Sequence, residues 1–391
     1  MRPLQVVVPA HPLDFLAGLR DALDGSGPAL LPVVRNGTLV APEVPKRVAV
    51  VIETSGSTGA PKRVMLATNA LLAGAAASTG ALGGAGQWLL ALPVHYIAGV
   101  QVLVRSIAAD TSPVVLPPGH FDPQIFRQLA ETMTEPLRYT ALVPVQLARL
   151  LAAAHDPALL AVLRRFTAIL VGGQAILPAL CLQAASLGVK IVRTYGSSES
   201  SGGCIYDGVP IGDTRVRVAD GQLELSGSVL ADGYLDDEAR NSDRFVTEHG
   251  VRWYRTGDLG EVHADSGLVT VLGRADNVII SGGEKVSLDA VERVVRSITG
   301  FAHAVVIGAD DATWGQVPVV VTTGGEPLAA DCSGLAAAVV QALGRAARPA
   351  RLVGVAEIPL LPSGKPDRMA LAGNMGAWHK ELGRHGPNNN D

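Results

Sequence analysis

Hydrophobic and polar positions recur with two different periods in the first half of the chain. Leucines at 13, 16, 19 and 23 are spaced three or four residues apart, which predicts an amphipathic helix over Leu13–Leu23. Short apolar runs bounded by Ser, Gly or Pro predict buried strands. These runs are Arg47–Ile52, Trp88–Pro93, Arg138–Val143, Ala168–Val171 and Lys190–Thr194. Because Ala- and Leu-rich helical segments separate the strands, the pattern predicts a layered α/β domain.

The stretch Val64–Val104 contains no Asp, Glu, Lys or Arg. Its length alone would fit a membrane span. However, it is rich in Ala and Gly, it contains Pro93, and the sequence GALGGAG interrupts it. We therefore predict a buried helix, loop and strand here, and no membrane association.

The pattern changes after Gly208. Arg215–Val218 and Gln222–Leu225 alternate apolar and polar residues around Asp220-Gly221, which predicts a β-hairpin with a mirror-type turn. Two further apolar runs predict additional strands, at Val251–Tyr254 and Leu268–Leu272. Together these segments predict a small β-barrel-like part at the end of the large domain.

A smaller α+β domain is predicted beyond Gly273-Arg274-Ala275-Asp276, so that residues 1–274 and 275–391 form two domains. Its helix runs over Leu288–Ile298, with Ser287 as the N-cap and Asp289 in the first turn, where a negative charge is favourable. Strands are predicted at Ala304–Ile307 and Val317–Thr322.

Composition and charge exclude several classes of protein. Of 391 residues, 48% are hydrophobic and 17% charged, which is typical of a globular protein rather than a disordered one. The net charge of −4, without a basic cluster, argues against nucleic acid binding. The cysteines lack metal or disulfide spacing and indicate reduced thiols in the cytoplasm: Cys181, Cys204 and Cys332. The apolar run at the N-terminus is too short for a signal peptide.

Five short motifs carry the candidate chemistry. They are TSGSTGAPKRV (Thr54–Val64), TYGSSE (Thr194–Glu199), YRTGD (Tyr254–Asp258), GRADNVIISGGEKV (Gly273–Val286) and LPSGKPDR (Leu361–Arg368). In the first motif, glycines let backbone N–H groups approach an anion, while hydroxyls and Lys62 bind phosphate oxygens. Its spacing differs from that of a Walker P-loop, and the alternative is an ordinary Ser/Gly loop.

In this order, the five motifs resemble those of the adenylate-forming acyl-CoA ligases. The resemblance covers roughly residues 50–371 and implies that the chain activates a small carboxylic acid with ATP and then transfers the acyl group to the thiol of CoA. It also implies Mg²⁺ as cofactor, a mobile C-terminal domain and the family's homodimer as a candidate assembly.

The resemblance assigns roles to individual residues. Tyr195 lies against adenine, Ser198 contacts the α-phosphate, Glu199 binds Mg²⁺, and Asp258 with Arg274 holds the ribose. The other predicted ATP-binding residues are Thr54, Ser55, Gly56, Ser57, Thr58, Gly59, Lys62, Gly173 and Gln174.

Further roles concern the acid, the second half-reaction and the hinge. His95 lies near the acyl carboxylate, and Gly172 and Gly196 lie at the acyl pocket, beside a helix that begins within Thr140–Leu151. Lys365 reaches the reacting oxygens during adenylation. Asp276 is the hinge, and Gly282 and Gly283 approach the CoA pantetheine.

Each role has a plainer alternative. Glu199 could cap a helix, Asp258 could cap a turn, and Arg274 could face solvent. His95 could be a core histidine and Lys365 a surface lysine. The glycine pairs could be ordinary turns.

The acid is suggested by a narrower resemblance. Only about fifty residues precede the phosphate loop, and the segments LPVHYIAGVQVLVRS and VIISGGEKVSLDAVE resemble the compact o-succinylbenzoate–CoA ligases of menaquinone synthesis. This substrate has a second carboxylate that needs a cation. Arg105, at the end of the uncharged stretch, is the candidate because a guanidinium matches a carboxylate in two-point contact; the alternative is that Arg105 reaches the surface.

Three other functions are alternatives. One is another aryl- or acyl-CoA ligase. A second is a non-ribosomal adenylation module, disfavoured because no carrier-protein segment follows Leu371. The third is a catalytically silent nucleotide-binding protein, disfavoured by the retention of Glu199, Asp258 and Lys365 together.

Overall fold

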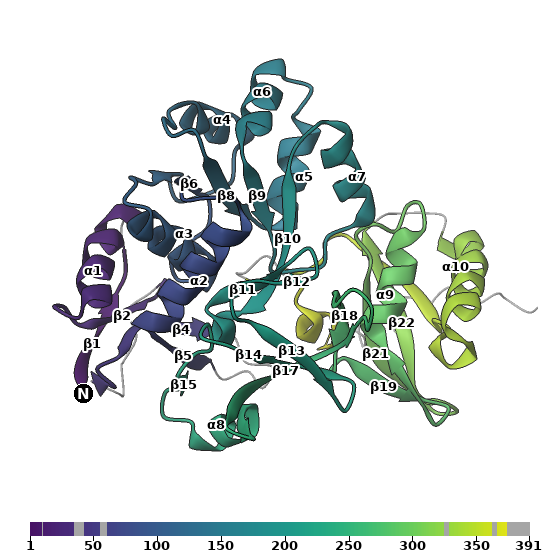
Figure 1. The fold of residues 1–391 in the computed structure, drawn as a ribbon. Coiled ribbons are helices and arrows are strands. Elements are labelled where there is room, and N and C mark those ends of the chain that lie inside the picture. Colours follow the sequence, from purple (N-terminus) through teal and green to yellow (C-terminus); the bar gives the residue numbers. More distant parts are fainter. Residues whose placement is uncertain (10, 35–42, 55–60, 324–327, 362–365, 374–391) are drawn as a thin grey trace, which may run out of the picture. The chain divides into compact units, whose positions relative to one another are not determined.

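The structure, a computed structural model, describes residues 1–9, 11–34, 43–54, 61–323, 328–361 and 366–373 (Figure 1). The chain divides into two compact units. Unit 1 comprises Met1–Thr256 and Glu261–Thr270, and unit 2 comprises Gly257–Gly260 and Val271–Asp391. The predicted hinge at Asp276 remains a prediction.

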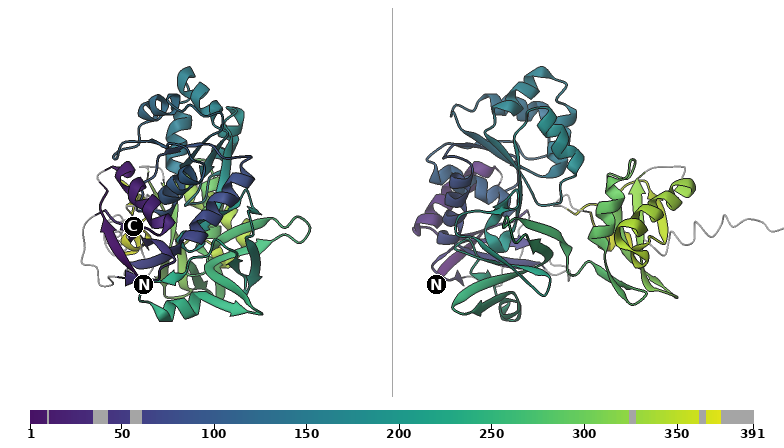
Figure 2. Two further views of the ribbon diagram at one scale, coloured as in Figure 1. Left: turned by 60° about the vertical axis from the view of Figure 1, so that its left-hand side comes forward. Right: turned by 45° about the vertical axis from the view of Figure 1, so that its right-hand side comes forward.

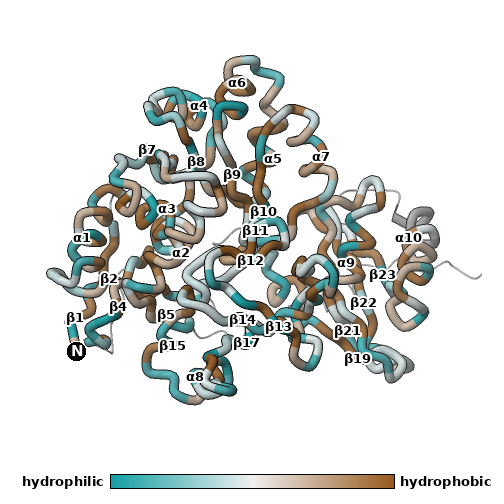
Figure 3. The backbone as a smooth tube through the Cα atoms, in the orientation of Figure 1, coloured by the Kyte–Doolittle hydropathy of each residue, from teal (hydrophilic) through white to brown (hydrophobic). Residues whose placement is uncertain are grey.

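The centre of unit 1 is a seven-stranded sheet with the order β12-β11-β10-β9-β8-β6-β7. Its parallel strands are β6 (Gln87–Leu90), β7 (Val114–Val115), β8 (Arg138–Leu142), β9 (Ala168–Val171) and β10 (Ile191–Ser197). The antiparallel strands β11 (Gly202–Tyr206) and β12 (Val209–Pro210) extend it. Four of the five strands predicted in the first half are confirmed here as β6, β8, β9 and β10, with shifts at their ends, and the fifth, Arg47–Ile52, lies in a second sheet; the α/β class is confirmed. In Figure 3, β9 is hydrophobic along its length, as expected for a strand buried on both faces.

Helices cover both faces of this sheet. Successive residues of a strand point to opposite faces, so they pack in different hydrophobic clusters. Leu89, Leu142 and Ile169 pack in the cluster that includes α4 (Pro123–Glu131), α5 (Pro144–Ala152), α6 (Pro157–Arg165) and α7 (Pro178–Ser186). Each of these four helices begins with Pro at its first turn, where the missing N–H costs no hydrogen bond. Trp88 and Leu90, on the other face, belong to a second cluster.

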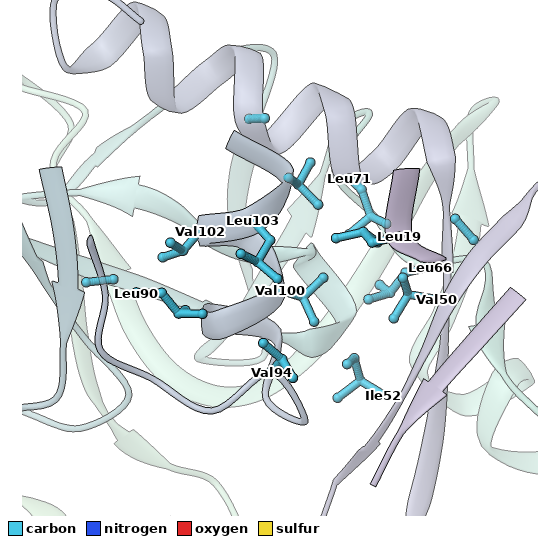
Figure 4. Packing of buried hydrophobic residues seen from close by; sticks show 14 of the residues in the cluster. Leu19, Val50, Ile52, Leu66, Leu71, Leu90, Val94, Val100, Val102 and Leu103 are labelled. Atoms are coloured by element: carbon cyan, nitrogen blue, oxygen red, sulfur yellow. The ribbon is translucent and has the colours of Figure 1, made fainter. Parts of the chain in front are cut away.

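This second cluster lies between the parallel sheet and a six-stranded sheet of order β15-β5-β4-β2-β1-β3. The strands are β1 (Arg2–Val7), β2 (Ala29–Pro32), β3 (Glu43–Val44), β4 (Val48–Thr54), β5 (Lys62–Ala67) and β15 (Gly233–Tyr234). Figure 4 shows Ile52 and Leu66 of this sheet on one side of the cluster and Leu90 on the other, with Val100 and Leu103 between them. Helix α1 (Pro12–Asp24) confirms the helix predicted from the leucine spacing.

The uncharged stretch forms β5, α2 (Thr68–Ala81), β6 and α3 (Ile97–Ala108). Buried residues of α2 and α3 belong to the cluster shared by both sheets, which explains why the stretch carries no charge. No helix within the described ranges is long and apolar enough to cross a membrane.

The predicted hairpin is confirmed. β13 (Arg215–Ala219) pairs antiparallel with β14 (Gln222–Ser226), and Asp220 and Gly221 both have positive φ (50° and 75°), as a mirror-type turn requires. With β16 (Phe245–Glu248), β17 (Val251–Val262) and β18 (Val269–Arg274), the hairpin forms a five-stranded sheet. The short helix α8 (Glu238–Arg244) precedes β16.

Unit 2 is a sheet of order β20-β19-β22-β21, with β23 paired to β22. Its strands are β19 (Val278–Ser281), β20 (Glu284–Ser287), β21 (Val305–Asp311), β22 (Gly315–Thr323) and β23 (Arg351–Val355). Helices α9 (Leu288–Ser297) and α10 (Leu328–Leu343) contact each other and the sheet, as the right-hand view of Figure 2 shows. Ser287 is the N-cap of α9 as predicted, because its side chain accepts a hydrogen bond from Ala290 N.

Candidate active site

The predicted site segments of unit 1 follow the carboxyl ends of neighbouring parallel strands. His95 comes after β6, Gly172-Gly173-Gln174 comes directly after β9, and Ser198-Glu199 comes directly after β10. Since β6, β8, β9 and β10 run in the same direction, these segments lie at one edge of the sheet. This edge is where open α/β sheets bind their ligands.

The two ends of the predicted phosphate loop lie side by side. β4 and β5 pair antiparallel, with Thr54 opposite Lys62 and Glu53 opposite Arg63. Arg63, where the resembling family usually has Gly, forms an ion pair with Glu53 at 3.1 Å. The loop residues themselves lie outside the described residues: Ser55, Gly56, Ser57, Thr58 and Gly59.

Glu199 has the best-defined surroundings of the predicted site residues. It is only 2% exposed, and its Oε1 accepts hydrogen bonds from Lys62 Nζ at 2.6 Å and from the Tyr234 hydroxyl at 2.9 Å. Burial alone would raise the pKa of Glu199, but the charge and hydrogen bond of Lys62 outweigh it, so the pKa is lowered. The carboxylate is therefore held ionised inside the protein.

The alternative role for Glu199 as a helix cap is wrong. Ser198–Ser200 forms a short 3₁₀ helix whose cap is Ser197, and the Ser197 side chain accepts a hydrogen bond from Glu199 N. Glu199 lies within this turn, and its side chain is directed to Lys62 on β5 instead.

Gly196 allows two strands to approach closely. A Cβ at this position would lie 2.0 Å from Gly202 O on β11, which no side chain tolerates. The pairing of β10 and β11 shifts its register between Tyr195 and Gly196. This irregularity marks the point where β10 leads into the turn that carries Ser198 and Glu199.

His95 lies in the connection between β6 and α3, half-buried beside Tyr96, with ring centroids 4.2 Å apart. Burial lowers the pKa of His95, so the imidazole is neutral near pH 7. Gly99 permits the tight connection, because a Cβ there would lie 2.3 Å from Pro93 O.

Arg105 is buried in the last turn of α3, with 5% exposure, so the alternative that it reaches the surface is wrong. Its guanidinium lies 4.8 Å from the Trp88 ring centroid, and Nη2 donates to the Tyr206 hydroxyl at 3.4 Å. Within the described part of the chain, its buried Nε has no hydrogen-bond partner. A buried cation with an unused donor can accept an anionic ligand.

Three predicted residues meet within unit 2. Arg274 forms ion pairs with Asp258 at 3.1 Å and with Asp276 at 3.0 Å, so it is not simply solvent-facing. The hydrogen bond with Asp276 raises the pKa of the Arg274 guanidinium; burial opposes this rise, and the charge of Asp258 adds to it. Gly282 and Gly283 form the turn between β19 and β20, with φ of 57° and 85°. Lys365 lies outside the described residues.

The donor set of unit 1 fits a magnesium ion bound together with nucleotide phosphates. No group of three or more His, Cys, Asp or Glu residues that could hold a metal occurs in the described ranges. Mg²⁺ needs no such group, since it is commonly held by one or two carboxylates together with phosphate oxygens and water. Glu199 supplies an ionised carboxylate next to the ends of the predicted phosphate loop.

Tyr234 was not predicted as a site residue, although it contacts Glu199 directly. It stands in a segment without a recognisable motif and reaches the site because β15 pairs with β5, with Tyr234 opposite Val64. Only this long-range strand pairing identifies it.

A layered α/β unit with ionised Glu199 and Lys62 at the carboxyl edge of its sheet, followed by a smaller α+β unit, is the arrangement of a nucleotide-dependent acid-activating enzyme. The chain belongs to the AMP-binding enzyme family: residues 8–232 match the AMP-binding enzyme and residues 290–365 match the AMP-binding enzyme C-terminal domain. The family resemblance seen in the motifs is thus confirmed.

Two relatives are named 2-succinylbenzoate–CoA ligase, the first of them as probable. The chain is 40% identical over 383 residues to a probable 2-succinylbenzoate–CoA ligase of Mycobacterium tuberculosis (strain CDC 1551 / Oshkosh), covering 95% of this chain and 97% of the relative. It is 30% identical over 287 residues to the 2-succinylbenzoate–CoA ligase of Escherichia coli (strain K12), covering 71% of this chain and 59% of that protein.

Among solved structures, o-succinylbenzoate CoA synthetase (MenE) from Bacillus subtilis, in complex with the acyl-adenylate intermediate OSB-AMP, is similar with a TM-score of 0.73. The identity is 23%, and the match covers 91% of this chain and 80% of the other. At this identity the similarity establishes the fold alone, which confirms the predicted order of a large and a small domain.

Proposed function

We propose that this chain is an AMP-forming 2-succinylbenzoate–CoA ligase of menaquinone synthesis. The observation that carries the proposal is the 40% identity to the Mycobacterium tuberculosis relative over nearly the whole of both chains. The buried Arg105 agrees with it, because a substrate with a second carboxylate needs a cation.

The reaction has two steps on one acyl group. In the first, a carboxylate oxygen of the acid attacks the α-phosphorus of ATP, and the bond to pyrophosphate breaks. In the second, the CoA thiol attacks the acyl carbon, loses its proton, and AMP leaves. The products are therefore the acyl-CoA, AMP and pyrophosphate.

Lys62 and the phosphate loop bind the phosphates, and Ser198 contacts the α-phosphate. Tyr195, Gly173 and Gln174 hold the adenine side of the nucleotide, while Asp258 and Arg274 bind the ribose. Glu199 would hold Mg²⁺ together with the phosphates, and the ion would neutralise phosphate charge. Positioning and charge stabilisation then supply most of the acceleration.

His95, Gly172 and Gly196 line the acyl site, and Arg105 pairs with the aromatic carboxylate, so that only the succinyl carboxylate is activated. Lys365 stabilises the adenylation transition state. Rotation about Asp276 then brings Gly282 and Gly283 to the pantetheine of CoA. The reaction takes place in the cytoplasm, in agreement with the free thiols of Cys181 and Cys204.

A product assay tests this function. Purified protein is mixed with ATP, Mg²⁺, CoA and one of several acids, namely o-succinylbenzoate, benzoate, coumarate or a fatty acid. We expect AMP and pyrophosphate with o-succinylbenzoate and much slower turnover of the monocarboxylates. Release of ADP and phosphate would refute the mechanism. Equal turnover of a monocarboxylate would refute the proposed substrate but not the proposal that the protein is an acid–CoA ligase.

A further inference from the structure

Tyr234 contacts the carboxylate that is proposed to bind the metal. Its hydroxyl donates to Glu199 Oε1 at 2.9 Å, and the tyrosine itself is 2% exposed. Lys62 donates to the same oxygen at 2.6 Å. Because both donors use Oε1, they constrain the orientation of the carboxylate, which also has a hydrogen bond with the Ser197 side chain.

The position of Tyr234 is defined on all sides. Its backbone N donates to Asn241 Oδ1 at 2.6 Å, and Asn241 Nδ2 donates back to Tyr234 O at 3.0 Å. Its ring packs against Phe245, with centroids 5.7 Å apart. A side chain held this firmly can hold its own hydrogen-bond partner in place.

Two of the donors to Glu199, Lys62 and Tyr234, would behave differently during the proposed reaction. In the proposed function Lys62 binds the nucleotide phosphates, which draws its charge away from Glu199. Each hydrogen bond that a buried carboxylate loses is costly. Tyr234 has no phosphate to bind, so its hydroxyl stays on Glu199 while the metal and the nucleotide enter.

We propose that Tyr234 is a positioning residue that orients the Glu199 carboxylate for a divalent cation bound with the nucleotide. This inference rests on the proposed function, in which Glu199 is the metal ligand. It predicts a specific effect on metal affinity, rather than a general loss of activity.

The test is binding of Mn²⁺ to the full chain in the presence of α,β-methylene-ATP, which cannot be cleaved at the α-phosphate, followed by electron paramagnetic resonance. We expect Tyr234→Phe to weaken Mn²⁺ binding about tenfold, in line with the loss of one hydrogen bond to a charged group. The Mg²⁺ concentration that gives half-maximal adenylation should rise by a similar factor, with little change in KM for the acid.

Tyr139→Phe is the matched control. Tyr139 is equally buried, and its hydroxyl donates to Leu82 O and Gly84 O, in the core of unit 1. This variant should lose stability without any change in Mn²⁺ binding. If Tyr234→Phe fails to fold, Asn241→Ala loosens the same tyrosine and should weaken Mn²⁺ binding by a smaller factor.

The outcomes separate the two proposals. If the wild-type protein binds no Mn²⁺ with the nucleotide, the metal role of Glu199 fails, and the positioning role fails with it. If the wild type binds Mn²⁺ and folded Tyr234→Phe binds it equally well, the positioning role alone is overturned. Unchanged binding by Asn241→Ala, where Tyr234→Phe is unfolded, overturns it as well.

Discussion

At the scale of single residues, two of the predicted site residues are buried charges whose partners differ in kind. Glu199 has a cation and a hydroxyl, whereas Arg105 has an aromatic ring and a hydroxyl. No carboxylate within the described residues forms an ion pair with Arg105. An anionic ligand would therefore stabilise this buried guanidinium, which has no carboxylate partner among the described residues.

We therefore expect Arg105→Ala to raise KM for o-succinylbenzoate, with kcat less affected, because the contact is made equally in the ground state and the transition state. The loss should be about 2 kcal/mol, roughly thirtyfold in kcat/KM. Arg105→Lys should also be impaired, because an ammonium group cannot make the two-point contact or stack on Trp88 in the same way. Steady-state kinetics with o-succinylbenzoate measure the effect of both substitutions. An unchanged kcat/KM in Arg105→Ala would contradict the assignment of Arg105 to the acyl site.

His95 gives a pH dependence whose sign follows from its burial. Its pKa is lowered in the folded protein. Below the ordinary histidine pKa of about 6.5, the unfolded chain gains a proton that the folded protein does not accept. The His95 contribution to stability is therefore fully present above that pH and is lost as the pH falls toward the folded-state pKa.

The measurement is urea unfolding of wild type and His95→Asn between pH 5 and 8. The free energy of unfolding of the wild type should fall more steeply on acidification than that of the variant. Parallel curves would mean that His95 titrates alike in both states.

At the scale of elements, the sequence predicted those helices and turns that depend on a few neighbouring residues. The leucine spacing predicted α1, Ser287 predicted the start of α9, and Asp220-Gly221 predicted the turn of the hairpin. The strand order of the parallel sheet was not predicted, and it is this order that brings Gly172 and Glu199 to the same edge.

Long-range pairings were not predictable in this way. β15 is only Gly233–Tyr234, too short for a periodic pattern, and its register on β5 is set by tertiary contacts. The Lys62–Glu199 pair likewise joins residues 137 positions apart. Both residues lie in recognised sequence motifs, but the spacing of the motifs along the chain did not indicate that Lys62 would form an ion pair with Glu199.

A substitution of Gly196 tests whether β10 and β11 must approach each other closely. Gly196→Ala would place a Cβ 2.0 Å from Gly202 O, so the strands must separate or shift. We expect a loss of about 1–3 kcal/mol in stability, as for overpacking, together with a large loss of adenylation because Ser198 and Glu199 move with β10. Thermal unfolding and pyrophosphate exchange measure the two effects.

The control is Gly221→Ala in the hairpin turn. Gly221 has a φ of 75° and no atom within 4 Å of its ideal Cβ, so the substitution introduces strain without a clash. It should cost about 1–2 kcal/mol of stability and leave adenylation intact. If both variants lose adenylation in proportion to their stability, Gly196 has no special role at the site.

At the scale of the whole molecule, the residues used in the proposed mechanism come from both units. Glu199 and Lys62 belong to unit 1, whereas Asp258, Arg274, Asp276 and Lys365 belong to unit 2. In the proposed mechanism a lysine that acts only during adenylation stabilises only the first transition state.

Lys365→Ala should therefore lose far more adenylation than thioester formation. We expect a cost of about 3 kcal/mol in the first step, similar to the loss of a strong oxyanion donor. Supplying pre-formed acyl-adenylate with CoA should restore near-normal thioester formation. A variant that is equally slow with the intermediate would contradict the assignment of Lys365 to the first step.

Asp276→Pro should show the opposite pattern, because proline fixes φ near −65° and a hinge must change its backbone dihedrals. Adenylation should persist, while transfer from pre-formed acyl-adenylate to CoA falls. The substitution also removes a carboxylate that pairs with Arg274 at 3.0 Å, so Asp276→Ala is needed to separate the two effects. Alanine deletes the ion pair but leaves the backbone free. If Asp276→Ala impairs CoA transfer as strongly as Asp276→Pro, the ion pair matters and the hinge does not; if only proline blocks the second step in a folded protein, the backbone at position 276 is where the rotation occurs.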